Sequence, residues 1–187
     1  MKVKISGSII YFLLISTLSV NAQILITNHS SVSFFSDGLL EDISATNSDA
    51  KGALNLATGE FLFRIPITSF HFENNLMQEH FNENYMESEK YPYATFKGKM
   101  SKDHLTQIDS TEQTISVEGM LTIHGIEKDR TIPVKFHNDK NGLVANSTFM
   151  VVLADHEIDI PTIVFQKIAE QVEVTVDISL AEKSNSL

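Results

Sequence analysis

Much of the chain alternates between apolar and polar residues. In EQVEVTVDISL near the C-terminus, one parity is polar and the other is apolar, namely Val172, Val174, Val176, Ile178 and Leu180. Because successive side chains of a strand point to opposite faces, this pattern predicts a strand with one dry and one wet face. The same period recurs in GEFLFRIPI, TISVEGMLTIHG and TIPVKF. The chain is therefore predicted to be mostly β.

Short polar connectors separate these strands: ATGE around Gly59, HGIEKDR, and DKNG ending at Gly142. Such connectors are typical of antiparallel hairpins. We count seven or eight strands, and in one of them, LVANSTFMVVL, the alternation fails, which predicts either apolar cover on both faces or a β-bulge. One apolar face per strand favours an extended antiparallel β-barrel, whose closure removes exposed edges. A β-sandwich is the alternative.

The stretch LMQEHFNENYMESEKYPYATF interrupts this pattern. Spacings of three and four predict one face of a short amphipathic helix, made of Leu76, Met77, His80, Phe81, Asn84 and Tyr85. Asn74 or Asn75 is the expected N-cap, and Tyr91-Pro92 the expected end, because the residue before proline avoids helical geometry. The helix is either a plug for one end of the barrel or part of a functional site.

The first residues have the features of a targeting segment. Lys2 and Lys4 precede the apolar run IIYFLLISTLSV, and VNA follows before Gln23. This arrangement predicts a cleaved secretory signal peptide over residues 1–22, and an uncleaved membrane anchor is less favoured because the run is short. The remaining residues 23–187 suit a single domain.

Charge and cysteine content narrow the function classes. The formal net charge is −10 at pH 7 and the chain has no cysteine. The acidity argues against nucleic acid as a partner. Without cysteine there is no disulfide, thiol catalysis, Cys-ligated metal or lipoprotein anchor. We therefore expect a periplasmic or secreted protein with no stable membrane anchor, and we expect no cofactor.

The seven histidines give no recognisable catalytic or metal motif. Neither H-E-x-x-H nor G-x-S-x-G occurs. The cluster DHEID, Asp155 to Asp159, is read as a polar hairpin loop rather than a cation site. His71 and His124 oppose the apolar parity, so His124 should face solvent or the barrel rim. Arg64 should point outward and pair with a surface acid, unless it lies near a mouth and meets an anionic headgroup.

Two longer stretches resemble a known family. MQEHFNENYMESEKYPYATFKGKM and SVEGMLTIHGIEKDRTIPVKF, together with SSVSFFSD and QVEVTVDISL, resemble the YceI-like family of secreted polyisoprenoid-binding proteins over Ile24 to about Leu180. The resemblance implies a lipocalin-like, lipid-binding barrel of about eight strands, with the helix near the ligand, and export to the periplasm. The tryptophan common near the start of many members is absent here.

The inward parity supplies candidate ligand-binding residues. We expect the cavity lining to include Phe61, Phe63, Ile65, Phe96, Val117, Leu121, Phe149, Val174 and Val176. The resemblance places the mouth at Met77, His80, Phe81 and Tyr85. We expect a non-enzymatic carrier or storage protein for a hydrophobic small molecule such as an isoprenoid, quinone or fatty acid derivative. A lipid-modifying enzyme on the same barrel, a packed barrel acting through protein partners, and a homodimer are left open.

Overall fold

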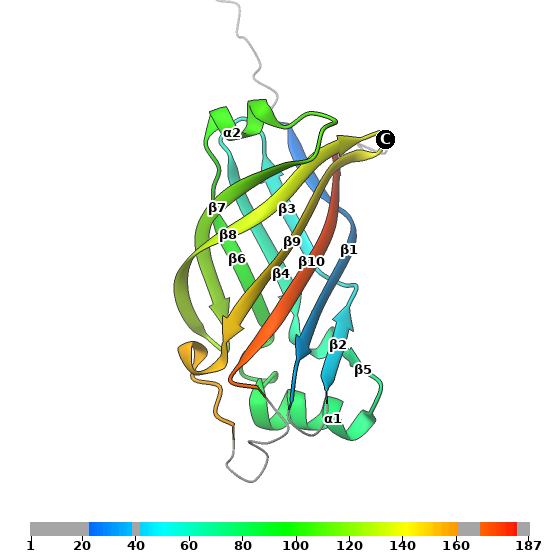
Figure 1. Ribbon diagram of the computed structural model, residues 1–187, viewed down its shortest axis with the longest axis vertical. Helices are drawn as coiled ribbons and strands as arrows, with labels where there is room; N and C mark the ends of the chain where they lie inside the picture. Colours follow the sequence, from blue (N-terminus) through cyan, green and yellow to red (C-terminus); the bar gives the residue numbers. More distant parts are fainter. Residues whose placement is uncertain (1–22, 39–41, 161–168, 183–187) are drawn as a thin grey trace, which may run out of the picture.

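The strands of the protein form one closed antiparallel barrel (Figure 1). The computed structural model describes residues 23–38, 42–160 and 169–182. The barrel order is β1-β3-β4-β6-β7-β8-β9-β10, and β10 pairs back to β1. The strands are β1 (Ile24–Ser36), β2 (Ile43–Asn47), β3 (Lys51–Asn55), β4 (Glu60–Pro66), β5 (His71–Phe72), β6 (Tyr93–Lys99), β7 (Gln113–Ile123), β8 (Ile126–Asp139), β9 (Gly142–Val152) and β10 (Gln171–Glu182). The predicted eight-stranded barrel is confirmed, and the pairing of β10 with β1 excludes the sandwich.

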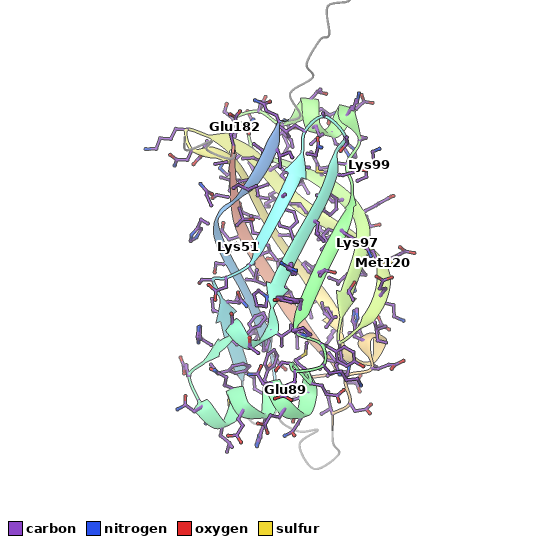
Figure 2. The ribbon with its side chains drawn as sticks, turned by 180° about the vertical axis from the view of Figure 1, so that it is seen from behind. Lys51, Glu89, Lys97, Lys99, Met120 and Glu182 are labelled. Carbon is purple, nitrogen blue, oxygen red and sulfur yellow. The ribbon has the colours of Figure 1, made fainter. Side chains whose placement is uncertain are left out.

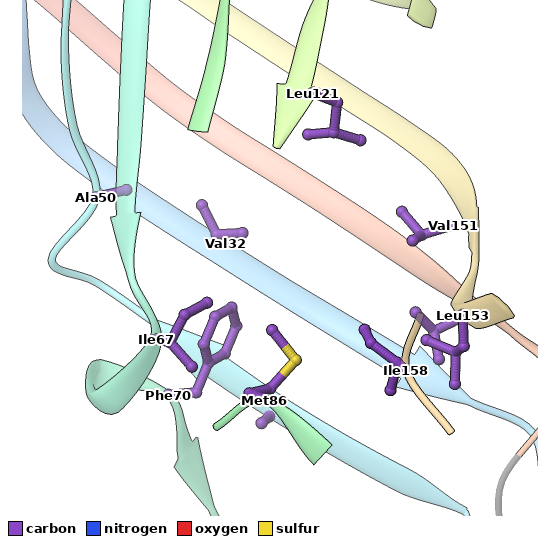
Figure 3. Packing of buried hydrophobic residues seen from close by; sticks show 11 residues of the cluster. Val32, Ala50, Ile67, Phe70, Met86, Leu121, Val151, Leu153 and Ile158 are labelled. Carbon is purple, nitrogen blue, oxygen red and sulfur yellow. The ribbon is translucent and has the colours of Figure 1, made fainter. Parts of the chain in front are cut away.

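The alternation of apolar and polar residues along each strand separates the inner face of the barrel from its outer face. Apolar side chains point inward and form two clusters, one near each end of the barrel. Figure 3 shows the first cluster, in which Ile67, Phe70 and Met86 lie close together. Polar side chains cover the outside, where Lys97 and Lys99 are exposed (Figure 2). A single wet face per strand is what a barrel of this kind requires.

Strands β2 and β3 behave as one strand with a break. Both pair with β1, β3 with Ile24–Ile26 and β2 with Val32–Ser36. The buried hydroxyl of Ser30 lies at the break, 3.1 Å from the Ser48 carbonyl oxygen and 3.0 Å from that of Ala50. Its single O–H proton can donate to either of these two backbone acceptors, which the interrupted ladder leaves without a strand partner.

Short helices cover the two ends of the barrel. The helix α1 (Asn75–His80) and the π-helical turn η2 (Phe81–Tyr85) lie across one end (Figure 1). Asn74 caps α1, its side-chain oxygen accepting from Leu76 N at 2.9 Å. The predicted helix and cap are confirmed, but the helix ends at Tyr85, because a further turn separates it from Tyr91-Pro92.

The helix α2 (Lys102–Gln107) at the opposite end was not predicted (Figure 1). It has a single apolar residue, Leu105, so it carries no helical periodicity. Leu105 and the following Ile108 pack against the core cluster at that end. The remaining short helices are the 3₁₀ turns η1 (Ile67–Ser69) and η3 (Leu153–His156).

Two predictions about β8 and β9 need correction. The stretch LVANSTFMVVL pairs with β10 in an unbroken register, and its outward Met150 and Val152 are 39% and 37% exposed, so neither a bulge nor double cover explains it. The bulge lies instead in β1, between Thr27 and His29. The connector HGIEKDR is only a two-residue turn at His124 and Gly125, both with positive φ, and the rest belongs to β8.

The predicted signal peptide, residues 1–22, lies outside the described residues. Within the described part of the chain, no helix has the length and apolar character needed to cross a bilayer.

The hydroxyl of Ser30 should matter for stability. We expect Ser30→Ala to lower the free energy of unfolding by about 1–3 kcal/mol, because the buried carbonyl of Ala50 and the partly buried carbonyl of Ser48 lose their donor. Urea unfolding measures the change. The matched control is Ser31→Ala on the opposite parity of β1, for which a change below about 0.5 kcal/mol is expected. Equal losses in the two variants would contradict this role for Ser30.

Candidate functional site

The interior of the barrel holds an apolar cavity of about 500 Å³. All eight barrel strands line it, together with α1 and η2. Its lining extends from Met100 and Leu180 near the α2 end to His80 and Phe81 at the α1 end. This volume lies within the range of about 300–1,000 Å³ that small-molecule sites usually have.

Every residue predicted from the sequence as lining or mouth is part of this cavity wall. Inward side chains in the middle of the wall, such as Phe63, Phe96 and Val176, are only partly buried. In a packed core these side chains would touch neighbours on all sides. Their remaining exposure means that the space in front of them is not filled by the described side chains. Their contact with a ligand stays a prediction.

An aromatic cluster closes the α1 end of the cavity. The ring centroid of Phe81, on η2, lies 5.5 Å from that of Phe34, 5.6 Å from that of Phe70 and 5.0 Å from that of Phe72. Sequence reasoning identified Phe81 only. Phe70 follows a 3₁₀ turn and Phe72 lies in a two-residue strand, so neither belongs to a run long enough to show a period. Phe34 lies in the SVSFFSD segment, whose resemblance to the family was a signal that could have identified it.

The described lining contains no Asp, Glu, Lys or Arg. Its polar members are Ser33, Ser36, Asn74, His80, Tyr85 and Ser147. Burial raises the pKa of Tyr85, so its phenol stays a neutral hydrogen-bonding group. The cavity can therefore hold an apolar chain and offer hydroxyl and imidazole groups near the α1 end.

A polar network ties the α1 end to the barrel rim. His124 Nε2 lies 3.0 Å from Glu87 Oε2, its Nδ1 lies 3.2 Å from the His156 carbonyl oxygen, and its ring packs on Tyr91. Of the two predicted alternatives for His124, solvent or the barrel rim, the structure shows the rim, with the side chain only 11% exposed. The left-handed backbone at His124 turns the ring against Tyr91.

The DHEID cluster belongs to η3 and the residues that follow it, and its three acidic residues are exposed, as the predicted polar loop implies. His156, in η3, is fully buried, and its Nδ1 lies 3.3 Å from the Ile126 carbonyl oxygen. Its Nε2 has no hydrogen-bond partner among the described residues. Burial lowers the pKa of His156. No group of three metal-ligating side chains occurs in the described ranges.

Arg64 points outward, as predicted, and its guanidinium lies 4.6 Å from the ring centroid of Tyr93. The predicted pairing with a surface acid is wrong for the part of the chain that the structure describes, in which no carboxylate comes within 4.0 Å of Arg64. Its contact is a cation–π interaction across neighbouring strands.

The comparison with family models decides the relationship. The YceI-like domain matches residues 24–180, which contain all but the end of the barrel. The chain belongs to the YceI-like family. The predicted resemblance is thus confirmed. A comparison with curated proteins returned no match.

Several solved structures share the fold. A polyisoprenoid binding domain from Saccharophagus degradans aligns with a TM-score of 0.76 at 13% identity, over 87% of this chain and 99% of that one. BcnA from Burkholderia cenocepacia aligns with a TM-score of 0.66 at 17% identity, over 81% and 96%. The YceI protein of Campylobacter jejuni aligns with a TM-score of 0.53 at 17% identity, over 73% and 82%.

The buried His156 should make stability depend on pH. Because burial lowers its pKa in the folded protein, the unfolded chain binds the proton more readily. The free energy of unfolding should therefore fall as the pH drops below about 6.5. His156→Gln, which does not titrate, should lose this part of the fall between pH 7.5 and 5.5 in urea unfolding. The exposed His29→Gln serves as control, and a fall in His156→Gln as large as in the control would contradict the assignment.

Proposed function

We propose that this YceI-like protein binds a long-chain amphiphile, such as an isoprenoid, a quinone or a fatty acid derivative, inside its barrel and serves as a carrier or storage protein. The observation that carries the proposal is the apolar cavity of about 500 Å³ with no charged side chain among its described lining residues. A cavity of this kind favours ligand binding over the alternative of a packed barrel that acts only through protein partners.

The free energy available supports such a guest. Burying a methylene group contributes roughly 0.8 kcal/mol, so about ten methylenes contribute roughly 8 kcal/mol before the cost of ordering the chain. Tyr85 and His80 at the α1 end can orient a polar headgroup by hydrogen bonds. The aromatic cluster around Phe81 would cover the chain on this side.

The relatives point to the same class of guest. The Saccharophagus degradans domain is described as polyisoprenoid binding, and its barrel matches this one over nearly its whole length. At 13% identity the match supports the fold alone, so an isoprenoid ligand for this chain is a proposal. Quinones and fatty acids are proposed together with the isoprenoid, because the apolar wall contains few groups that could select among apolar chains.

We also propose export, with residues 1–22 removed and residues 23–187 acting as one domain. The basic start and the short apolar run carry this proposal. The first strand begins at Ile24, so cleavage before Gln23 removes no residue of the described barrel. Detecting the mature N-terminus in an exported fraction by mass spectrometry would test it, and an intact N-terminus would contradict it.

Filling the cavity should abolish binding without unfolding the protein. Val176 faces the cavity between the two core clusters, whereas its neighbour Thr175 is on the outer face. We expect Val176→Trp to weaken binding of farnesol, a short-chain ubiquinone and dodecanoate by at least about tenfold. Thr175→Trp should bind like the wild type. Fluorescent-ligand displacement measures both variants.

The stability of the same variants distinguishes an open interior from a packed one. In a packed core an added indole costs about 1–3 kcal/mol. Val176→Trp should cost less than that relative to Thr175→Trp, because the cavity offers room. If the wild type binds none of the three compounds and Val176→Trp is strongly destabilised, the interior is packed and the carrier proposal is wrong.

A further inference from the structure

The barrel wall has one place where two neighbouring strands run on without pairing. Strands β8 and β9 are hydrogen-bonded from the hairpin at Asp139 and Gly142 only as far as Lys135 and Asn146. Beyond that point β8 continues to Ile126 and β9 to Val152. The two ribbons visibly separate below the hairpin (Figure 1). We call the unpaired stretches, Ile126–Val134 of β8 and Ser147–Val152 of β9, the β8–β9 split.

Pro133 accounts for the position of the split. The N–H and C=O of one strand residue point to the same side, and the Pro133 carbonyl faces β9, since it accepts a hydrogen bond from Ser147 Oγ at 2.6 Å. The missing N–H of the proline is therefore on the β9 side, at the position where the ladder stops. The strands are held there by side chains instead.

The split borders the cavity. Ile132 and Val134 on β8, and Ser147, Phe149 and Val151 on β9, all line it. Arg130 itself is not among the described lining residues, so a headgroup at the split would lie beside this part of the cavity wall, where the ladder between the two strands is interrupted.

Arg130 spans the split. It occupies the same parity of β8 as the cavity-lining Ile132, and its Nη2 donates to the Met150 carbonyl on β9 at 2.7 Å. Its partner on β7 is Gly119, and the ring of Phe96 occupies the space next to this glycine. The half-buried guanidinium has five N–H donors, of which this contact uses one.

Arg130 differs from three other cations of the wall, although Lys51 and Lys99 also lack an ion pair among the described residues. Lys97 pairs with Glu127 and Lys135 pairs with Glu112, while Arg64 packs on Tyr93. Among the residues with described positions, no carboxylate lies within 4.0 Å of Arg130. Lys128, exposed and on the same parity, adds a second cation without such a partner. Glu127 and Asp129, on the opposite parity of β8, balance these two charges, so the split has no net charge and only the parity that Arg130 and Lys128 share is basic.

We propose that the β8–β9 split is a headgroup site for an anionic amphiphile, with the carboxylate or phosphate bound by Arg130 and the apolar tail in the cavity. This inference rests on the proposed function and narrows it, since it selects fatty acids and prenyl phosphates over quinones and alcohols. A guanidinium suits such groups because it binds them in a two-point, charge-assisted contact.

The test compares two ligands that differ only in headgroup, dodecanoate and dodecanol, at pH 8. The wild type should prefer dodecanoate. Arg130→Gln should bind dodecanoate about tenfold or more weakly and dodecanol as before. Arg130→Lys, which keeps the charge, should retain part of the preference. Lys135→Gln removes one charge from the same strand outside the split and should change neither affinity.

Each other outcome has a distinct meaning. If Arg130→Gln changes neither affinity, the headgroup site is not at the split. If it weakens both ligands equally, Arg130 only holds the wall together, and the inference is wrong in that case as well. In both cases dodecanol binding to the wild type leaves the carrier proposal standing. If the wild type binds neither ligand, the carrier proposal itself fails, and this inference fails with it.

Discussion

The pairing of β1 with β10 is the constraint on which the rest of the structure depends. It runs from Leu25 opposite Glu182 to Phe35 opposite Glu173 and joins the two ends of the sheet. Once the sheet is closed, each strand must present one parity to a common interior, and no long edge is left along β1 or β10. Eight strands give an interior that side chains can fill or that one slender guest can occupy. Here the inward side chains do not fill it.

The departures from a regular barrel are concentrated where strands lose their hydrogen-bonding partners. At the break between β2 and β3, Ser30 provides the missing donor from inside the wall. At the β8–β9 split, Ser147 and Arg130 bridge the strands through their side chains. At the α1 end, His124 links Glu87 to the backbone of η3. Buried or partly buried backbone groups need partners, so a gap in a ladder calls for polar side chains at that point. Of these side chains, Ser147 also lines the cavity.

Much of the architecture could be predicted because a period of two depends only on local sequence. The runs holding Phe61, Val117 and Val176 show which side of the wall they face, and all three line the cavity. The helix after β5 could also be predicted from its cap and its spacing. Each of these features depends on residues that are close together in the sequence, so it can be recognised without the structure.

The remaining features depend on contacts between segments far apart in the chain. The two-residue strand β5 exists only because β2 lies beside it, and α2 is stabilised by the core it covers. The burial of His124 and His156 follows from the meeting of three loops, which no local period reveals. Pro133 did carry a signal, since a proline inside an otherwise regular strand indicates an unpaired edge. Arg130 could be placed at that edge only once the register of β8 and β9 was known.

The central claim is that the barrel holds an amphiphile, and native mass spectrometry of the mature protein, purified from an exported preparation, tests it most directly. The account predicts a bound mass that is released by organic extraction and is identified as an isoprenoid, a quinone or a fatty acid derivative. A protein that carries no adduct and takes up none from a panel of quinones, prenyl phosphates and fatty acids would contradict it.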